Sequence, residues 1–271
     1  MLRIETSLGA KADRVDLYRT SPKEEHAKNL IAESCELWVD GVKTLTYLQN
    51  FPMEDLRGAV RAIEKIGSNR RQSGVPSQSR TFGFMPRMPV QQRDYCFGCT
   101  LNRDYPATKN VLFRYAEKFT ELLGKHHPEK LTLSRQAIST VQPDWVIPHS
   151  VFTSGIVNQD NPLQYHYDAG NFEGTWSVMA MLKHQVAGGH LVLPEFGIKL
   201  ACADSSVLIF DGQSELHGVT PIRKMHADSY RFSIVFYSLE RMCKCGTPRE
   251  ELRRAQKSRT ATEMKRAGVT K

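Results

Sequence analysis

Apolar residues are spaced differently in the two halves of the chain. Residues 53–66 and 109–124 carry apolar side chains three or four positions apart, which is the spacing of an amphipathic helix. After about residue 136 the apolar residues come in short runs separated by Gly, Pro, Asn and Asp. The runs are 144–158, 175–184, 188–202, 205–212, 217–222 and 231–239. Several short strands at close spacing, without helices between them, predict a β-sandwich or barrel.

A charged segment follows the predicted β-region. Thr247, Pro248 and Glu250 combine a capping box with proline at the first helical position, so we expect a helix to begin there. The pattern as a whole predicts an α+β chain in three parts. These are an N-terminal helical extension (1–68), a β-core domain with its supporting helix (69–246) and a basic C-terminal tail (247–271).

Positive charge is concentrated in two segments. The 271 residues carry a formal net charge of +8, and residues 241–271 hold ten Lys or Arg against three Glu, a net charge of +7. Residues 69–93 contain no acid and five arginines, which are Arg70, Arg71, Arg80, Arg87 and Arg93. Two basic segments on a nearly neutral body are typical of a protein that binds a polyanion, most often nucleic acid. Charge that only keeps the chain soluble is the alternative.

Composition limits the setting in which the chain works. No apolar run approaches the roughly 20 residues of a transmembrane helix, so we expect no membrane association. The first 14 residues lack the apolar stretch of a secretory signal. Six cysteines in a chain of this length do not indicate a disulfide scaffold. We therefore expect an intracellular monomer in a reducing compartment.

The stretch QYHYDAGN places a histidine and an aspartate two residues apart. On a strand, His166 and Asp168 point to the same face and can approach one metal ion. A facial iron site needs two histidines, one carboxylate and open positions on the metal. His217, which follows the run 205–212, is the best-placed second histidine. Both the H-x-D pattern and a downstream histidine also occur by chance.

The run 231–239 begins with an arginine that the strand period turns inward. Arg231 and Ser233 share one face, and the apolar residues between and after them take the other. An arginine inside a β-barrel is costly unless it meets an anion, and its planar fork suits a carboxylate. An Arg/Ser pair placed 14 residues after His217 is what a 2-oxoglutarate site needs. An ion pair with an Asp or Glu of the core is the alternative.

This order of motifs resembles the 2-oxoglutarate/Fe(II) dioxygenases, which fold as double-stranded β-helices of the jelly-roll or cupin type. More narrowly, it resembles the TET/JBP nucleobase dioxygenases, in a compact fungal-type or phage-type form. HYDAGN is similar to the H-x-D-x-x-N pattern of that family, and HGVTPI is similar to its H-x-x-T-P segment. Residues 188–212 are similar to its glycine-led strand pair, and residues 80–96 are similar to a segment of compact fungal members. The resemblance covers roughly residues 80–240.

The resemblance implies a role for each motif residue. His166, Asp168 and His217 would hold Fe(II). Arg231, helped by Ser233, would bind the distal carboxylate of 2-oxoglutarate.

Two further roles follow from the same resemblance. An upstream arginine would also reach the cosubstrate, with Arg80 and Arg87 as candidates that the sequence does not separate. Asn171 would contact a flipped-out base.

The implied activity is oxidation of the methyl group of a modified base in DNA, by base flipping and ferryl hydrogen abstraction. We take 5-methylcytosine as the first choice, with thymine and N6-methyladenine as alternatives. The partner would be double-stranded DNA, whose phosphates the two basic segments would hold. In a eukaryote the location would then be nuclear.

Two other functions fit the same motifs. One is a 2-oxoglutarate dioxygenase that acts on a protein or a small molecule, as prolyl hydroxylases do. The other is a cupin-like binding module without turnover. A structural zinc site is a separate expectation, with Cys96, Cys99, Cys243 and Cys245 as ligands, although such cysteines are often only small buried residues.

Overall fold

The structure is a computed structural model that describes residues 1–7, 9, 11–64, 68–70, 76–91 and 93–266. Of the expected basic segment, Arg71 and the side chain of Arg70 lie outside the described part. Residues 267–271 of the tail lie outside it as well.

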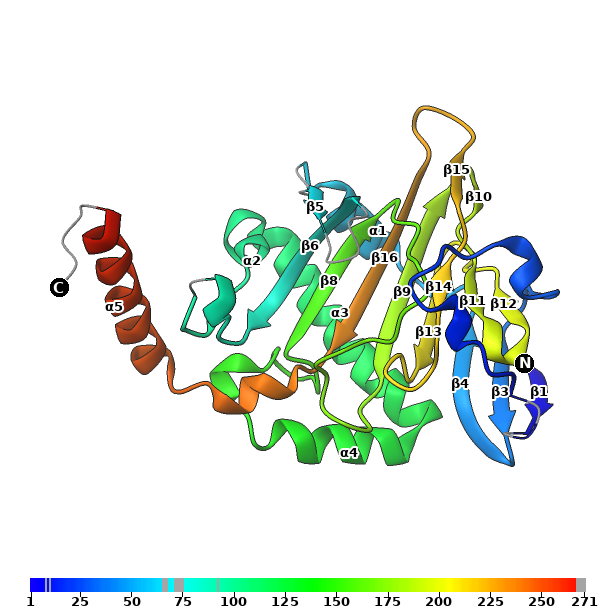
Figure 1. The fold of residues 1–271 in the computed structure, drawn as a ribbon, viewed down its shortest axis with the longest axis horizontal. Coiled ribbons are helices and arrows are strands. Elements are labelled where there is room, and N and C mark those ends of the chain that lie inside the picture. Colours follow the sequence, from blue (N-terminus) through cyan, green and yellow to red (C-terminus); the bar gives the residue numbers. More distant parts are fainter. Residues whose placement is uncertain (8, 10, 65–67, 71–75, 92, 267–271) are drawn as a thin grey trace.

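A large, mainly antiparallel sheet forms the body of the molecule (Figure 1). In spatial order its strands are β1 (Leu2–Thr6), β3 (Cys35–Val39), β4 (Val42–Leu48), β13 (Ser206–Phe210), β9 (Ser177–His184), β16 (Tyr230–Tyr237), β8 (Ser154–Gln159), β6 (Pro76–Met85) and β5 (Ser68–Arg70), with β7 (Phe97–Gly98) paired to β6. Within the described part of this sheet, β1 and β3 are the one parallel pair. The predicted β-region therefore supplies the centre of this sheet.

A smaller sheet packs against one end of the large one. It contains β14 (Gly218–Val219), β11 (Leu191–Leu193), β12 (Ile198–Leu200) and β2 (Asn29–Ile31), and a separate pair is formed by β10 (Val186–Gly188) and β15 (Ile222–Lys224). Buried side chains of both sheets meet in one cluster, with Met179 and Met181 from the large sheet and Leu191 and Leu193 from the small one. Two sheets packed face to face are the arrangement expected of a double-stranded β-helix.

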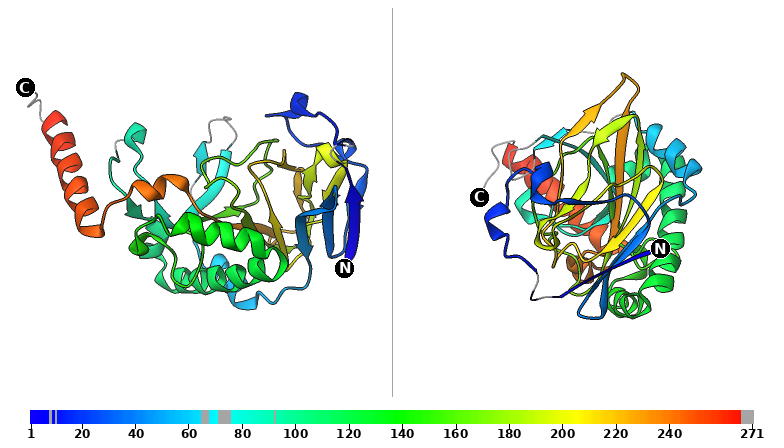
Figure 2. Two further views of the ribbon diagram at one scale, coloured as in Figure 1. Left: turned by 90° about the horizontal axis from the view of Figure 1, so that it is seen from below. Right: turned by 90° about the vertical axis from the view of Figure 1, so that its right-hand side faces the viewer.

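Helices cover the outer face of the large sheet (Figure 2). They are α1 (Glu54–Arg61), α2 (Thr100–Asp104), α3 (Pro106–His126) and α4 (Pro128–Ile138), and α5 (Pro248–Arg266) projects from the other end. Short 3-10 helices lie at Val15–Leu17, Glu24–His26, Pro89–Gln91, Pro143–Trp145, Pro194–Phe196 and Glu240–Lys244. Phe119 of α3 packs edge-on to Phe236 of β16, with 5.1 Å between ring centroids. The predicted helices over 53–66 and 109–124 thus correspond to α1 and α3, whereas α4 was not predicted.

The first 68 residues differ from the expected helical extension. Among the described residues they contain β1 to β4, the first residue of β5 and a single α-helix, α1. The segment CELWV alternates buried and half-buried side chains, and a tight turn at Asp40 and Gly41, both with positive φ, returns the chain as β4. Because β4 pairs with β13, these strands extend the large sheet, and the expected boundary at residue 68 falls within that sheet.

The expected start of the C-terminal helix is confirmed. The backbone N–H and hydroxyl of Thr247 donate to the carboxylate of Glu250 at 2.7 and 2.9 Å, and α5 begins at Pro248. In return, the amide of Glu250 donates to the hydroxyl oxygen of Thr247 at 3.4 Å, which completes the capping box. Within the described residues, no helix combines the length and the apolar character needed to span a membrane.

Candidate functional site

The two predicted histidines are joined by a backbone bridge. The amide of His166 donates to the carbonyl of His217 at 2.9 Å, and the reverse bond measures 3.1 Å. The bridge places the two imidazole rings 4.3 Å apart. Oδ1 of Asp168 lies 3.7 Å from Nε2 of His166 and 4.0 Å from Nε2 of His217. One ligand atom from each of these three residues can therefore face a common point.

Both histidines present the same ring nitrogen to that point. Nδ1 of His166 lies 2.7 Å from the carbonyl oxygen of Gln164, and Nδ1 of His217 lies 2.9 Å from that of Glu215. Because a carbonyl only accepts, Nδ1 carries the proton in each ring and Nε2 is the nitrogen available to a metal. Two such imidazoles and one carboxylate form the donor set of a facial Fe(II) site. The residues therefore fit Fe(II).

A glycine that we did not single out from the sequence makes room for the carboxylate. The amide of Asp168 donates to the carbonyl of Gly212 at 2.7 Å, which holds the two backbones together. A Cβ at position 212 would lie 2.3 Å from Oδ2 of Asp168. Gly212 follows Asp211 in a D-G pair at the end of a predicted strand, which indicates a turn but not this close contact.

The three metal-ligand candidates lie on the wall of a cavity of about 260 Å³. Arg231, Ser233 and Asn171 line the same cavity. Much of the remaining wall is apolar, with Met179, Leu191, Phe210, Val219 and Val235 among its residues. The sequence-predicted iron ligands, the Arg/Ser pair and the asparagine are thus brought together.

Arg231 is the largest fully buried side chain in the described structure, with 1% of its surface exposed. Its Nη2 donates to the carbonyl of Gly189 at 2.9 Å, and its Nε has no hydrogen-bond partner. Asp160 accepts from the backbone amide of Arg231 and pairs with Lys224 at 2.6 Å. Burial lowers the pKa of the Arg231 guanidinium, and the proximity of Cys202 and of Asp160, which forms no ion pair with it, opposes this effect.

The core ion pair that would explain this arginine is therefore missing from the described residues. A buried cation without a carboxylate partner is costly. An anionic ligand in the adjoining cavity would supply that partner, so the site fits a dicarboxylic acid such as 2-oxoglutarate.

The other polar residues of the cavity come from three neighbouring segments. Nδ2 of Asn158 lies 3.4 Å from Oγ of Ser233, and Nδ2 of Asn171 lies 3.4 Å from Oγ of Ser177. Asn158 was not among the predicted site residues, although it pairs with Ser233 across β8 and β16. Gly189 was also missed, and a Cβ there would lie 2.6 Å from Nε of Arg231.

Comparison with known proteins assigns the chain to a protein family. The model of the Tet_JBP family, described as the oxygenase domain of the 2OGFeDO superfamily, matches residues 96–240, more than half of the chain. The chain belongs to the Tet_JBP family. Residues 96–240 accordingly form an oxygenase domain of the 2OGFeDO superfamily.

Curated members of the Tet_JBP family are similar in part of their length. The chain is 28% identical to thymine dioxygenase JBP1 of Leishmania infantum over 162 residues, which are 59% of this chain and 19% of that protein. It is 27% identical over 117 residues to the bifunctional helicase and thymine dioxygenase JBP2 of Trypanosoma brucei brucei (strain 927/4 GUTat10.1), 43% of this chain and 10% of that protein. The chain therefore spans about a fifth or less of the length of these relatives.

A solved structure of NgTET1 in complex with 5mC DNA has a similar fold. It superposes with a TM-score of 0.61 over 93% of this chain and 90% of that one, at 16% sequence identity. This likeness concerns the fold, and together with the family match it confirms the expected double-stranded β-helix with helices packed on it.

The two upstream arginines of this Tet_JBP chain do not line the cavity. Arg80 lies on β6, forms an ion pair with Asp104 and stacks over the ring of Tyr105 at 4.8 Å. Arg87 forms an ion pair with Glu251 of α5. The expectation that either one reaches the cosubstrate is therefore not supported. Arg80 shares the face of β6 that carries Phe82, which is packed under the helices, because side chains alternate along a strand.

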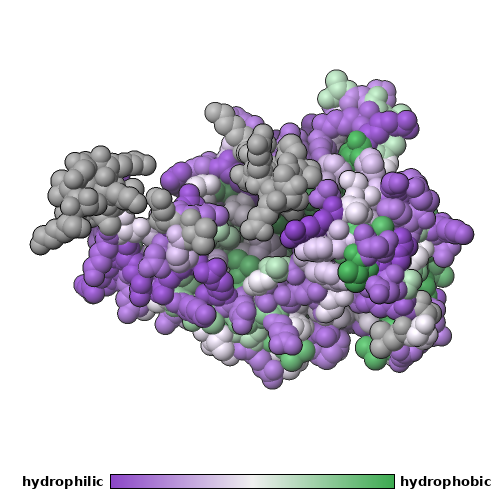
Figure 3. All heavy atoms as spheres, in the orientation of Figure 1, coloured by the Kyte–Doolittle hydropathy of each residue, from purple (hydrophilic) through white to green (hydrophobic). Residues whose placement is uncertain are grey.

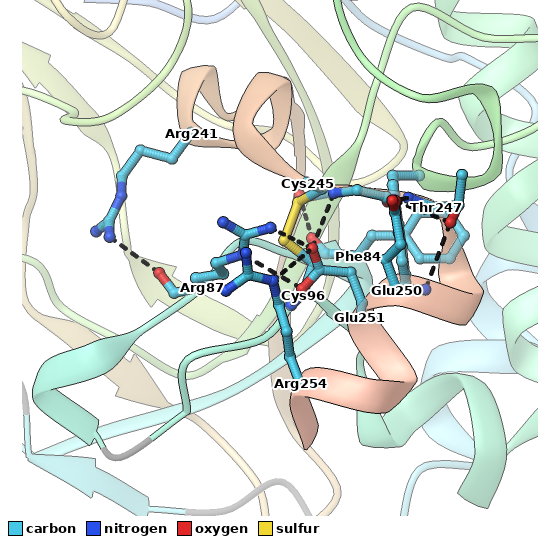
Figure 4. The surroundings of a disulfide bond; sticks show 12 residues. Phe84, Arg87, Cys96, Arg241, Cys245, Thr247, Glu250, Glu251 and Arg254 are labelled. Carbon is cyan, nitrogen blue, oxygen red and sulfur yellow. Dashed lines mark hydrogen bonds and ion pairs between the residues drawn. A yellow bond between two sulfur atoms is a disulfide. The ribbon is translucent and has the colours of Figure 1, made fainter. Parts of the chain in front are cut away.

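The four cysteines expected to bind zinc are also arranged differently. Cys96 and Cys245 form a disulfide (Figure 4). A metal binds the thiolate form of cysteine, so these two residues cannot act as zinc ligands while the bond is intact. Cys99 is buried, which raises the pKa of its thiol to about 11, and Cys243 is exposed. Zinc is unsupported, and among the described residues the sole group with metal-ligand geometry is His166, Asp168 and His217. From the sequence we expected a reducing compartment and no disulfide scaffold, and the structure contains one disulfide among the described residues.

Proposed function

We propose that this chain is a 2-oxoglutarate- and Fe(II)-dependent dioxygenase that oxidises the 5-methyl group of a pyrimidine in DNA. The observation that carries the proposal is the buried Arg231, without a carboxylate partner, on the wall of the cavity that also holds the three-residue donor set. The named activities of the relatives support the choice of substrate. JBP1 and JBP2 are thymine dioxygenases, and NgTET1 was solved with 5mC DNA.

Each cavity residue has a role in this proposal. His166, Asp168 and His217 would hold Fe(II), which when bound supplies the activation of O2 for the oxidation. Arg231 binds the distal carboxylate of 2-oxoglutarate through its guanidinium, and Ser233 adds a hydroxyl donor beside it.

The rest of the cavity would orient the base and keep water away from it. Asn171 contacts the base, and its amide can meet either the amino group of 5-methylcytosine or the carbonyl of thymine by rotation. It therefore does not choose between them. The apolar wall excludes water from the reacting methyl group. A base cannot reach an enclosed site from within a duplex, so the proposal includes base flipping.

Three further expectations belong to the proposal. Double-stranded DNA is the partner, a monomer is the acting unit, and a genomic substrate places the protein in the nucleus of a eukaryotic host. The division into an N-terminal part, an oxygenase domain and a basic tail is likewise proposed, with the first part merged into the large sheet.

The test is mass spectrometry of nucleosides from DNA incubated with the protein, Fe(II) and 2-oxoglutarate. Separate duplexes would contain 5-methylcytosine, unmodified thymine or N6-methyladenine, with methylated RNA and a proline-rich peptide as further substrates. We expect an oxidised 5-methylpyrimidine together with succinate. Oxidation of the peptide with no change in any DNA would reject the proposal in favour of a protein hydroxylase.

Two variants and one control tie the activity to the site. His217→Ala should abolish turnover, whereas His184→Ala, which removes an exposed histidine outside the cavity, should leave it intact. Arg231→Met should raise the KM for 2-oxoglutarate by roughly 10- to 100-fold, since a hydrogen bond to a charged group contributes about 1.5–3 kcal/mol. Unchanged 2-oxoglutarate dependence in Arg231→Met would mean that another group binds the cosubstrate.

A further inference from the structure

Two segments of the chain leave the cavity and continue into a basic surface. Met85 and Leu239 line the cavity, and an arginine follows each of them two residues later. The guanidinium of Arg241 donates to the carbonyl oxygen of Arg87 at 3.0 Å, so the two segments lie side by side (Figure 4). The basic surface therefore begins next to the cavity wall.

The C-terminal helix is fixed to the body beside these segments. Glu251, in its first turn, is 2% exposed and accepts hydrogen bonds from the amides of Cys96 at 2.7 Å and Gly246 at 2.8 Å. Arg87 forms an ion pair with the same carboxylate, and the disulfide lies directly beside it (Figure 4). Beyond this first turn α5 extends away from the body (Figures 1 and 2). The anchor thus sets the position from which α5 projects.

A groove of about 620 Å³ lies at the foot of α5. Its charged lining consists of five basic side chains and one acid, namely Arg87, Lys244, Arg253, Arg254, Lys257 and Glu250. The surface around the foot of α5 is strongly hydrophilic, at the left of Figure 3. We call this concavity the α5 groove.

Most of the positive charge in the α5 groove is directed to solvent. Lys244, Arg253 and Lys257 are exposed, and within the described part of the chain none of them forms an ion pair. Arg253 and Lys257 are four residues apart, so they share one face of α5. Glu250, the only acid, already accepts two hydrogen bonds from Thr247. Like charges held together in a groove favour an anionic occupant.

We propose that the α5 groove binds phosphates of the DNA strand that flanks the base in the cavity. This inference rests on the proposed action on DNA and adds where the backbone is held. The groove starts where the cavity wall ends, and its charge is complementary to a phosphate backbone. Because it lies on one side of the cavity, it would contact phosphates on one side of the target base, which fixes the direction of the strand across the site.

The test compares DNA affinity in two variants with the same loss of charge. Arg253→Ala/Lys257→Ala removes two cations of the groove, and Lys125→Ala/Arg135→Ala removes two exposed helical cations from the opposite, helix-covered face. Fluorescence anisotropy would follow a modified duplex at several salt concentrations. For the groove variant we expect about a fivefold or greater loss of affinity, and a decrease of roughly 1 to 2 in the slope of log K against log salt concentration. The control variant should behave as the wild type.

Neutral methylphosphonate linkages locate the contact along the strand. Placed on one side of the target base, they should weaken binding by the wild type and have little further effect on the groove variant. Placed on the other side, they should weaken both proteins equally. Equal affinity and salt slope in the groove variant and the wild type would overturn the inference, even if the wild type oxidises DNA. Absence of any DNA binding by the wild type would overturn both the inference and the proposed partner, whereas binding without oxidation would count against the proposed function alone.

Discussion

The carboxylate of the donor set depends on a residue that has no side chain. Asp168 can face the two histidines only because Gly212 leaves space beside its Oδ2. The backbone hydrogen bond between the two residues also keeps them close together. The position of this candidate metal ligand is therefore determined by the lack of a Cβ at residue 212, which follows β13.

Gly212→Ala should displace the Asp168 carboxylate and weaken metal binding by at least about tenfold, because correct placement of each ligand determines the affinity. Titration with Co(II), followed by its absorption spectrum, measures this directly. Gly58→Ala is the matched control, since a Cβ there meets nothing within 4 Å and alanine favours a helix. Metal affinity equal to that of the wild type in Gly212→Ala would show that the carboxylate has another way to reach the metal.

For single residues, the sequence predicted the contacts that follow from the two-residue period of a strand. The i and i+2 rule placed His166 with Asp168 and Arg231 with Ser233, and all four line one cavity. It did not identify Gly189 or Gly212, because their contacts join positions more than 40 residues apart in the chain. It also left Arg80 and Arg87 unseparated, and neither lines the cavity, because the register of the strand that carries Arg80 is set by pairing with a distant strand.

Among the elements, α5 is attached to the body through the buried carboxylate of Glu251. Burial alone would raise the pKa of Glu251, but hydrogen bonds from Arg87 and from the amides of Cys96 and Gly246 together outweigh it, so the pKa lies below its ordinary value. A lowered pKa means that the folded state prefers the carboxylate. The attachment therefore contributes stability at pH values above the ordinary pKa, about 4.3. It loses that stability as the pH falls through the lower folded value.

We expect Glu251→Gln to be less stable than the wild type at neutral pH, by roughly 1–3 kcal/mol, because it leaves Arg87 without its charged partner. The difference should shrink as the pH drops below about 4, since the wild-type carboxylate then becomes protonated too. Urea unfolding from pH 7 to pH 3 measures both values. A stability difference independent of pH would show that the charge of Glu251 is not what holds the helix.

The predictability of the elements followed the strength of their local signals. The short apolar strands of the β-core and the capped start of α5 were evident from the sequence. The hairpin of β3 and β4 was missed although its Asp40-Gly41 turn is a hairpin signal, because the strands it joins contain charged residues and resemble irregular chain. The helix α4 carries a weak amphipathic pattern, and its packing against α3 explains it.

At the scale of the whole molecule, the sequence did not predict the disulfide between Cys96 and Cys245. The sequence placed Cys96 and Cys245 among four candidate zinc ligands, and sequence distance could not reveal that these two meet across 149 residues. A cross-link over such a separation restricts the unfolded chain strongly, and it adds roughly 2–5 kcal/mol to the free energy of unfolding.

Cys96→Ser should therefore unfold at a lower temperature than the oxidised wild type, and a reducing agent should bring the wild type to the temperature of the variant. Thermal unfolding with and without a reductant measures the effect. Cys243→Ser, which removes an exposed thiol two residues from Cys245, is the control and should keep the full response to reduction. If the reductant leaves the unfolding temperature of the wild type unchanged, the disulfide does not stabilise the fold.

The same bond has a topological consequence for the oxygenase region. The family match begins at Cys96 and ends five residues before Cys245, so the bridge closes the whole region into a covalent ring. A single cut anywhere inside that ring leaves the two halves tethered to each other. They would migrate as one species until the bond is reduced and as two afterwards. A nicked molecule can thus keep both sides of its cavity in one piece.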